Sequence, residues 1–440
     1  MNAHYDWIST ADNSWTLKPN DHRFLTRLRH FFTKLHEQSP AYAQRFEEAG
    51  FMPPFDDPWS LYLALPSMDK AFYREPLEAE ALHRLNHQNT FVCDFSSGST
   101  AQCVLRFSAP IDELAEQSIT ETVFKRAGMG PGDHFICLEV GVAEIYDFYF
   151  RAARNLGVNR TSFLHLTGRY GPSIAPLKKL NPTVILTLPS ILARIWPHVK
   201  NLWPKGQSPI HTLIHMGESM HSALKAEIQH HWGCRIISFY GTTEIGGMAG
   251  ECPHNTGCHF EPMNTLLTLT DAKQLDDNTV EGEALFTTLH FTTQPVIKYR
   301  VADLLQVTSN PCVCGESTPR LTFLERTRDA FIITGVKFRH STIMEALREI
   351  VPELRYLSIV LDDLSEESGN TRVTLHLPEA FKDQETELLE QVIQGVFDMD
   401  AIHRYGLVRF EACFLKDTEF GSRKIRKVID NRQYMGQQGD

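Results

Sequence analysis

The sequence predicts an α/β protein that has a large N-terminal domain and a small α+β C-terminal domain. Between about residues 90 and 250, short apolar runs alternate with amphipathic stretches. That alternation is typical of a largely parallel sheet whose strands are joined by helices. Beyond residue 328 the pattern changes to two helices over a small sheet, and 440 residues suffice for both domains. We therefore expect one domain over residues 1–327 and a second over residues 328–440.

The elements of the N-terminal domain are predicted from apolar spacing. Residues 21–50 should be helical, because apolar side chains recur every three or four positions until Gly50 stops the run. The apolar residues of this face are Phe24, Leu25, Leu28, Phe31, Phe32 and Leu35. The later predicted elements are a turn into a helix at 65–70, strands at 184–187 and 212–215, a helix at 219–232, and strands at 283–289 and 296–300.

The C-terminal domain is predicted in the same way. Val373, Leu375 and Leu377 alternate as the residues of a half-buried strand should. The other expected elements are a strand at 331–334, a helix at 341–351, a strand at 357–361, a helix at 379–397 and a strand at 407–414.

The composition excludes several classes of function. The formal net charge is −11 and the isoelectric point is near 6, which argues against a duplex nucleic-acid partner because phosphate binding needs a basic face. No apolar run is long enough to span a bilayer, and the start, from Met1 to Trp15, lacks the apolar region of a signal peptide. We therefore expect a cytoplasmic protein without a membrane partner. Its nine Cys should be reduced thiols or metal ligands.

The most specific short signal is the run Tyr240-Gly241-Thr242-Thr243-Glu244. It predicts the end of a strand that breaks into a loop and holds a hydroxyl and a carboxylate close together. Such a loop can orient a nucleotide phosphate through the hydroxyl and hold Mg²⁺ through the carboxylate. The alternative is a Gly-rich loop that closes a Rossmann-like layer.

A second loop is predicted from the run Ser96-Ser97-Gly98-Ser99-Thr100. Consecutive hydroxyls beside a glycine suit a loop that contacts β- and γ-phosphates. The run is not a Walker A loop, because the Gly-Lys-Ser/Thr ending is absent. A Ser/Gly-rich surface turn is the alternative interpretation.

Three other segments carry polar residues that could contact a ligand, and each also has a purely structural interpretation. Gly217-Glu218-Ser219 follows a predicted strand and is equally well explained as a turn with Ser219 as helix N-cap. Asp303 lies three residues after Arg300, and a surface salt bridge between these two is the alternative to a ligand contact. Near the C-terminus, Lys424 lies in a basic run that a solvated terminal strand would also explain.

Two short Cys/His clusters predict a zinc site. Cys252, Cys312 and Cys314 are the expected ligands, and either Cys258 or His259 completes the set. Thiolates and imidazoles at such spacings suit tetrahedral Zn²⁺, and a closed site of four protein ligands is structural. Free buried thiols are the alternative.

These motifs resemble those of the adenylate-forming superfamily, which includes acyl-CoA synthetases, carrier-protein adenylation domains and firefly luciferase. The resemblance is closest to the phenylacetate–CoA ligase family and covers nearly the whole chain. It extends from residues 41–50 through Gly246-Gly247 to the ending Val428-Ile429-Asp430, and some family members share the Cys clusters. The phosphate loop departs from the pattern, with Ala101 in place of a Gly and Gln102 in place of a Lys.

The resemblance implies roles for individual residues. Thr243 would hold a phosphate oxygen, Glu244 would bind Mg²⁺, and Lys424 would be the catalytic lysine that bridges the carboxylate and the α-phosphate. Asp303 would accept hydrogen bonds from both ribose hydroxyls, and Arg326 would contact ribose or phosphate. The other implied nucleotide contacts are Ser96, Ser97, Gly98, Ser99, Thr100, Gly217, Glu218, Ser219, Tyr240, Gly241 and Thr242. The implied hinge is Arg328 or Asp329, and the acyl-pocket candidates are Tyr146, His215, Phe239 and Gly246.

The function implied by the resemblance is activation of a carboxylic acid, aryl or arylalkyl, by ATP and Mg²⁺. The acyl-adenylate would then pass its acyl group to CoA as the mobile C-terminal domain turns, while Zn²⁺ would be structural. Two alternatives stay open because of Ala101 and Gln102. One is an adenylase that serves a carrier protein or an amine, and the other is a non-catalytic nucleotide-binding protein. The identity of the acid and the oligomeric state, with a homodimer among the options, cannot be read from the sequence.

Overall fold

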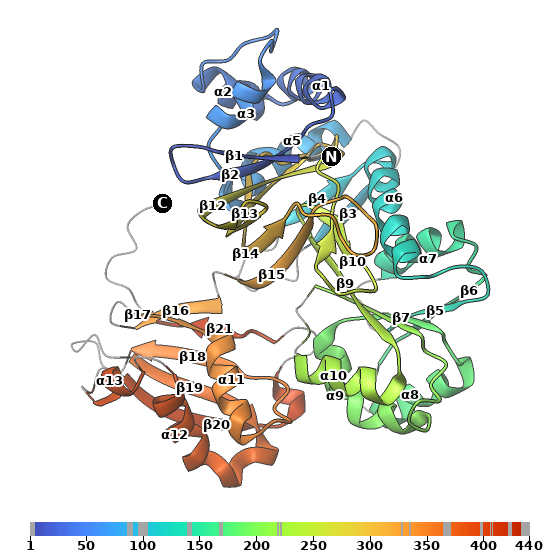
Figure 1. Cartoon of the computed structure of the whole chain (residues 1–440), viewed down its shortest axis with the longest axis vertical. Helices are drawn as coiled ribbons and strands as arrows, with labels where there is room; N and C mark the ends of the chain where they lie inside the picture. The colour runs from blue at the N-terminus through green and yellow to red at the C-terminus, as the bar shows by residue number, and fades with distance from the viewer. Residues whose placement is uncertain are drawn as a thin grey trace. The chain divides into compact units, whose positions relative to one another are not determined.

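The computed structural model of the chain divides into two compact units (Figure 1). The first comprises Met1–Leu188, Trp203–Ser219 and Trp232–Leu324, and the second comprises Pro189–Leu202, Met220–His231 and Glu325–Asp440. None of the described helices has the length and apolar character needed to cross a bilayer. The structure describes residues 5–85, 91–95, 104–138, 143–166, 170–217, 220, 222–326, 329–333, 336–363, 371–396, 399–404, 406, 408–420 and 425–432.

Parallel strands form one half of the large sheet in the first unit, in the order β9, β8, β7, β5 and β6. β5 and β7 are buried along their whole length, as strands of a parallel sheet usually are. The strands are β5 (His134–Leu138), β6 (Arg160–Leu164), β7 (Val184–Thr187), β8 (Thr212–Met216) and β9 (Arg235–Thr242). The predicted α/β class is confirmed, since strands and helices alternate through this region.

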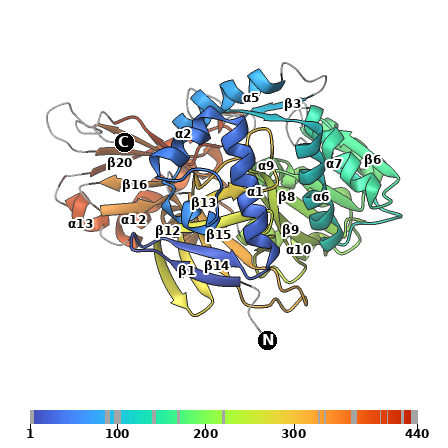
Figure 2. The same cartoon turned by 90° about the horizontal axis from the view of Figure 1, so that it is seen from above.

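Helices alternate with these strands along the chain. α6 and α7 lie side by side in the first unit (Figure 2). The helix predicted at residues 219–232 is α10, and its described part begins at Ser222. The helices are α6 (Pro110–Arg126), α7 (Ala143–Asn155), α8 (Tyr170–Leu180), α9 (Pro189–Val199) and α10 (Ser222–Trp232), and a 3₁₀ turn spans Lys200–Leu202.

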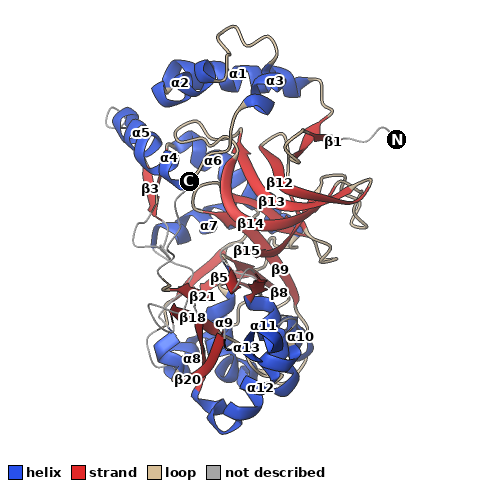
Figure 3. Ribbon diagram, turned by 90° about the vertical axis from the view of Figure 1, so that its left-hand side faces the viewer, coloured by secondary structure: helices blue, strands red, loops and turns tan. Residues whose placement is uncertain are grey.

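The other half of the sheet is antiparallel and continues from β9 in the order β10, β11, β15, β14, β13, β12, β2 and β1. Figure 3 shows β12, β13 and β14 as long, strongly bent strands. The strands are β1 (Tyr5–Ser9), β2 (Trp15–Pro19), β10 (Gly246–Glu251), β11 (Cys258–His259), β12 (Thr265–Asp276), β13 (Thr279–Thr288), β14 (Tyr299–Thr308) and β15 (Arg320–Arg326).

A strand was predicted at 296–300, and its predicted start was wrong, because the regular strand begins at Tyr299. The backbone N–H groups of Val296 and Lys298 donate to the hydroxyls of Thr288 and Thr287, at 3.0 and 2.8 Å. Lys298 also has a φ of +51°, a left-handed conformation that interrupts a strand.

Residues 21–50 are largely helical, as predicted, but the helix is interrupted once. The structure has α1 (Arg23–Gln38) and α2 (Pro40–Glu48), with Ser39 extended between them. Proline disfavours helical backbone in the residue before it and is tolerated at the first position of a new helix, which explains the break. Of the predicted apolar face, Leu25 is 41% exposed and the other five side chains are buried.

The remaining short elements of the first unit lie between α2 and α6 in the chain. β3 and β4 pair in antiparallel register, with Asp94 opposite Arg106. The elements are α3 (Pro58–Ala64), α4 (Lys70–Phe72), a π-helical turn (Tyr73–Leu77), α5 (Glu78–Leu85), β3 (Val92–Phe95) and β4 (Leu105–Ser108).

The second unit contains a separate four-stranded sheet, in the order β20, β19, β18 and β21, and the hairpin β16–β17. Its core includes Ile343 and Leu347 of α11 against Ile359 and Leu375 of the sheet. The helix predicted at 379–397 begins as a 3₁₀ turn (Glu379–Gln384) before α12. The elements are β16 (Ala330–Ile333), β17 (Val336–Arg339), α11 (His340–Ile350), β18 (Ser358–Asp363), β19 (Thr371–Pro378), α12 (Glu385–Gly395), α13 (Met399–Arg404), β20 (Val408–Leu415), a 3₁₀ turn (Asp417–Phe420) and β21 (Val428–Asp430).

A buried carboxylate fixes the start of α6 in the first unit. Asp112, which is 2% exposed, accepts a hydrogen bond from the backbone N–H of Ala109 at 3.1 Å. It also accepts from the N–H groups of Thr292 and Thr293 at 2.6 and 3.2 Å. One side chain therefore caps the helix and holds the loop between β13 and β14 against it.

Replacing Asp112 by Ala should lower the free energy of unfolding by about 2–4 kcal/mol, because each buried N–H left without an acceptor costs about 1–3 kcal/mol. Leu114→Ala, on the same helix, is the control: its side chain is 61% exposed. That substitution should change stability by less than about 0.5 kcal/mol. Urea unfolding followed by circular dichroism measures both, and equal midpoints for the two variants would contradict the assigned role of Asp112.

Candidate active site and metal cluster

The run Tyr240-Gly241-Thr242-Thr243-Glu244 forms the end of β9 and the turn into β10. The two strands pair in antiparallel register, with Thr242 opposite Gly246. Thr243 and Glu244 occupy the turn itself. A side chain at Gly241 would overlap the backbone of Gly246, so the hairpin closes this tightly only because residue 241 is glycine.

Two tyrosines hold the carboxylates of this region. The Tyr240 hydroxyl donates to Asp303 Oδ2 at 2.7 Å, and the Tyr299 hydroxyl donates to Glu244 Oε1 at 2.9 Å. Burial and the neighbouring Glu244 carboxylate raise the pKa of Tyr299 far above its ordinary value, so the phenol keeps its proton and stays a donor. The structure thus brings Tyr240, Glu244 and Asp303, three residues that the sequence singled out, into contacts between the hairpin and β14.

The contact from Tyr240 to Asp303 joins strands that are not neighbours. β10, β11 and β15 lie between β9 and β14 in the strand order. The Tyr240 ring also lies 6.1 Å from the ring of Phe286 on β13. The sheet must therefore curl back on itself so that these strands face one another.

Arg300 does not form the salt bridge with Asp303 that the sequence left open. Its guanidinium pairs with Glu283 on β13, and Asp303 is 2% exposed in the interior of the first unit. Beside the turn, the buried hydroxyl of Thr242 has no hydrogen-bond partner among the described residues. A buried hydroxyl in that state is suited to a hydrogen bond with a ligand.

The acyl-pocket candidates lie on three neighbouring strands and one helix. His215 on β8 and Phe239 on β9 are each 4% exposed. The Phe239 ring packs against Phe124 and Tyr149, with ring centroids 6.5 and 6.4 Å apart, on the face of the sheet opposite Tyr240. Gly246 begins β10, and the side chain of Tyr146, on α7, lies outside the described part of the structure.

Several predicted residues lie at or beyond the edges of the described structure. Gly217 follows β8 with a φ of +73°, and Arg326 ends β15. Asp329 in the second unit pairs with Lys427 at 3.6 Å. The residues outside the described part are Ser96, Ser97, Gly98, Ser99, Thr100, Glu218, Ser219, Arg328 and Lys424.

The predicted metal ligands converge after β10 and β14. One ligand atom from each of Cys252, His259, Cys312 and Cys314 lies within 4.8 Å of all the others. The Cys252 and Cys312 sulfurs are 3.8 Å apart, and Cys314 Sγ is 3.5 Å from His259 Nε2. Cys258 Sγ instead lies 3.7 Å from the Ser238 carbonyl oxygen, so His259 is the fourth member of the group.

The imidazole of His259 is oriented by contacts on its far side. Nδ1 lies 2.9 Å from the Thr318 hydroxyl and 3.7 Å from Glu316, which leaves Nε2 directed at the thiols. Burial and the nearby Arg126 lower the pKa of His259 to about 4, which keeps the ring neutral, as a metal ligand must be. Three thiols and one neutral imidazole with an oriented ring fit the ligand set and the supporting contacts of structural Zn²⁺.

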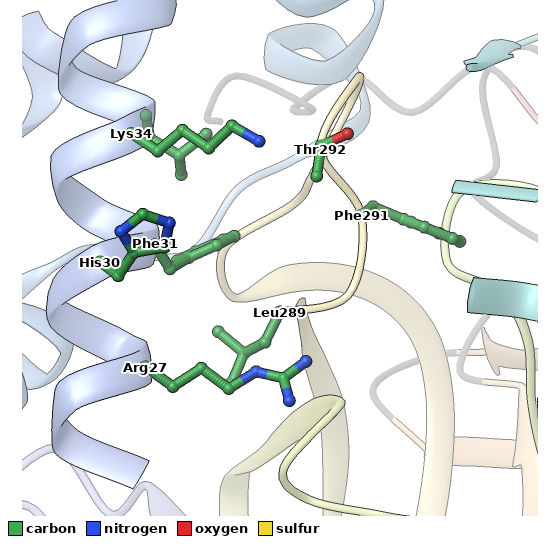
Figure 4. A pocket seen from close by; sticks show the side chains of 8 residues that line it. Arg27, His30, Phe31, Lys34, Leu289, Phe291 and Thr292 are labelled. Atoms are coloured by element: carbon green, nitrogen blue, oxygen red, sulfur yellow. The ribbon is translucent and has the colours of Figure 1, made fainter. Parts of the chain in front are cut away.

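A cavity of about 160 Å³ lies between α1 and the loop after β13 (Figure 4). Arg27 and Lys34 of α1 extend toward Leu289 and Thr292 across it, and His30 also lines it. A neighbouring cavity of about 670 Å³ shares Lys34 and Thr292. The described residues that line them include none of the predicted acyl-pocket residues.

Known proteins resemble the chain in sequence and in fold. A phenylacetate–coenzyme A ligase of Thermus thermophilus is 27% identical over 218 residues, which cover 48% of this chain and 44% of the ligase. A phenylacetate–coenzyme A ligase of Escherichia coli is 31% identical over 133 residues, which cover 28% and 29% of the two chains. The matched part spans less than half the length of these curated relatives. No protein-family model matches the chain.

Among solved structures, a 2-hydroxyisobutyryl-CoA ligase in its postadenylation state gives a TM-score of 0.73. Its sequence is 20% identical, and the match covers 93% of this chain and 89% of that one. The chain has the fold of the adenylate-forming ligases. An amide bond synthetase of Marinactinospora thermotolerans shares this fold at a TM-score of 0.51 and 14% identity, with 89% and 90% of the chains covered. The resemblance to phenylacetate–CoA ligases that the motifs predict is confirmed by the curated relatives.

Removing the Tyr240 hydroxyl should cost more stability than removing that of Tyr299. Tyr240→Phe removes one charge-assisted hydrogen bond from the buried Asp303 carboxylate, and we expect a loss of about 1.5–3 kcal/mol. Tyr299→Phe affects a partly exposed carboxylate that water can reach. It should cost about 1 kcal/mol or less. Urea unfolding of both variants tests this order, and the reverse order would contradict it.

Proposed function

We propose that the protein uses ATP to convert a carboxylic acid into an acyl-adenylate and then transfers the acyl group to CoA. The observation that carries this proposal is the contact of the β9–β10 hairpin with β14, where Tyr240, Glu244 and Asp303 meet. The fold shared with solved ligases and the names of the curated relatives support it. The division into an adenylation domain over residues 1–327 and a mobile domain over 328–440 belongs to the same proposal.

In the first half-reaction, an oxygen of the substrate carboxylate attacks the α-phosphorus of ATP. A P–O bond forms, and the bond to pyrophosphate breaks. Asp303 would accept the ribose hydroxyls, and Thr243 would donate to a phosphate oxygen. Glu244 would hold Mg²⁺, which neutralises charge on the phosphates. Lys424 would supply an ammonium beside the α-phosphate, where negative charge builds.

In the second half-reaction, the CoA thiolate attacks the acyl carbon. A C–S bond forms, the C–O bond to phosphate breaks, and AMP leaves with the electron pair. The C-terminal segment would turn about Arg328 or Asp329 between the two steps. The ion pair between Asp329 and Lys427 lies beside this hinge and would restrain it.

The acid is proposed to be aryl or arylalkyl. Of the residues assigned to its pocket, Tyr146, His215 and Phe239 offer flat rings. The named substrate of the curated relatives supports this class. A small hydroxy acid is the competing class, since a 2-hydroxyisobutyryl-CoA ligase shares the fold.

Exchange of labelled pyrophosphate into ATP should depend on an added aromatic acid. Lys424→Ala should lower the rate of this exchange by about 10²–10³-fold, because that is the usual cost of losing one preorganised hydrogen-bond donor. Arg426→Ala is the matched control, since this nearby basic side chain is exposed and has no role in the proposal. Its adenylation rate should change less than tenfold. With CoA present, an acyl-CoA product should accumulate.

Three outcomes would contradict parts of this proposal. ATP binding without exchange across aromatic, aliphatic and hydroxy acids would refute catalysis and favour a nucleotide-binding protein. Exchange without an acyl-CoA product, but with acyl transfer to a carrier protein or an amine, would refute CoA as acceptor. Exchange that survives Lys424→Ala would refute the role of Lys424.

We also propose that Cys252, His259, Cys312 and Cys314 bind a structural Zn²⁺. The mutual distances below 4.8 Å and the burial of three of the four residues support this. A set of four protein ligands leaves no open position for substrate, so the ion would stabilise the fold without entering the reaction.

The purified protein should contain about one zinc per chain, as a closed tetrahedral site binds one ion. Cys312→Ser should remove most of it and lower the melting temperature, because metal binding adds directly to folding free energy. Cys258→Ser should retain the zinc, since Cys258 lies outside the group. Elemental analysis and thermal unfolding measure both effects, and zinc-free wild-type protein that unfolds identically with and without added zinc would contradict the site.

A further inference from the structure

A carboxylate from a distant helix holds the strand that follows the proposed magnesium turn. Glu116 of α6 accepts a hydrogen bond from the backbone N–H of Gly247 at 2.7 Å, across 131 residues of sequence. The other oxygen of Glu116 pairs with the guanidinium of Arg106 on β4. Glu116 is therefore bonded on one side to the β9–β10 hairpin and on the other side to β4.

Arg106 extends this connection to the flanks of the predicted phosphate loop. Its guanidinium is 4.0 Å from the carboxylate of Asp94, which lies directly opposite it in the β3–β4 pair. It also lies 4.6 Å from the centre of the Phe291 ring. Since β3 ends at Phe95 and β4 begins at Leu105, the two strands flank residues 96–100 along the chain.

We propose that Glu116 and Arg106 are positioning residues that couple the flanks of the phosphate loop to the turn carrying Thr243 and Glu244. This inference rests on the proposed function. Neither residue is assigned a contact with substrate. Their role is to set the separation of two segments that must grip the same triphosphate.

The space around Gly246 makes the turn sensitive to the position of Glu116. A Cβ atom on Gly246 would lie 2.7 Å from Glu116 Oε1 and 2.9 Å from the Phe291 ring. The carboxylate therefore packs directly on the backbone at the start of β10, in addition to bonding Gly247. A shift of Glu116 would be passed to Glu244, two residues before Gly246.

The charges of the pair explain why its geometry is tightly defined. The side chains of Arg106 and Glu116 are 6% and 13% exposed. Burial by itself raises the pKa of a carboxyl, but Arg106 outweighs this and holds the pKa of Glu116 below its ordinary value. Both groups are ionised, and in a buried pair the loss of one partner leaves the other charge uncompensated.

The test compares Glu116→Ala, Glu116→Gln and Glu113→Ala in the full-length chain. Glu113 lies on the same helix and pairs with Arg151 at 3.1 Å, so its removal also breaks a partly buried ion pair. Glu116→Ala should raise the KM for Mg-ATP in pyrophosphate exchange by about tenfold or more, because the two segments that grip the triphosphate would lose their relative position and a loss of about 1.4 kcal/mol of binding free energy is tenfold. Glu116→Gln keeps an oxygen that can accept from Gly247 and should restore most of the KM. Glu113→Ala should leave the KM within about twofold, as expected of a pair away from the reacting groups.

Hydrogen exchange monitored by mass spectrometry gives a second readout that does not need turnover. Peptides covering β3–β4 and peptides covering β10 should both exchange faster in Glu116→Ala, but not in Glu113→Ala. Faster exchange in β10 alone, or a lower turnover number at unchanged KM, would overturn the coupling and leave Glu116 a stabilising residue. Wild-type protein without pyrophosphate exchange would refute the proposed function, and the hydrogen-exchange comparison would still decide the coupling.

Discussion

The hydrogen bond from Tyr240 to Asp303 joins two strands that the sheet order keeps apart. β10, β11 and β15 lie between β9 and β14, so the bond can form only if the sheet curls strongly enough to face its own strands. β-Sheets twist with a fixed hand, but a sheet that curls this strongly also needs places where two segments of backbone approach closely. Gly241 allows such an approach within the β9–β10 hairpin, since a side chain there would overlap Gly246. The position of the site thus depends on a property of the whole sheet.

The three carboxylates near the hairpin differ in the donors that hold them. Asp303 and Glu244 each accept from a tyrosine, which is neutral, whereas Glu116 is paired with the cation Arg106. A neutral donor orients a carboxylate and leaves its charge available to a further cation or donor. The charge of Glu116 is already balanced. The ion pair with Arg106 is a physical reason to assign a positioning role to Glu116.

Local sequence rules predicted the parts of the fold that depend on neighbours in the chain. The strands at 184–187 and 212–215 follow from their apolar composition. The break before Pro40 follows from the rule that the residue before a proline avoids helical backbone. The prediction missed this break because it used only the spacing of the apolar residues. The choice between Cys258 and His259 depends on which face each side chain of β11 points to. Adjacent strand residues point to opposite faces of the sheet, so only one of the two can join the metal cluster. The sequence does not say which one. Glu116 could not be found, because an acidic residue in a helix has no local signal for a contact 131 residues away.

The Cys/His cluster joins loops that follow β10 and β14 in the same sheet. Cys252 comes directly after β10, and Cys312 and Cys314 lie between β14 and β15, so the group joins the segments that follow Glu244 and Asp303 in the chain. β11, with two residues, is too short to fix the separation of β10 and β15 by backbone hydrogen bonds alone. The proposed zinc would supply that missing constraint. A metal site remote from the reacting atoms would then help to set the distance between β9 and β14, on which the contact between Tyr240 and Asp303 depends.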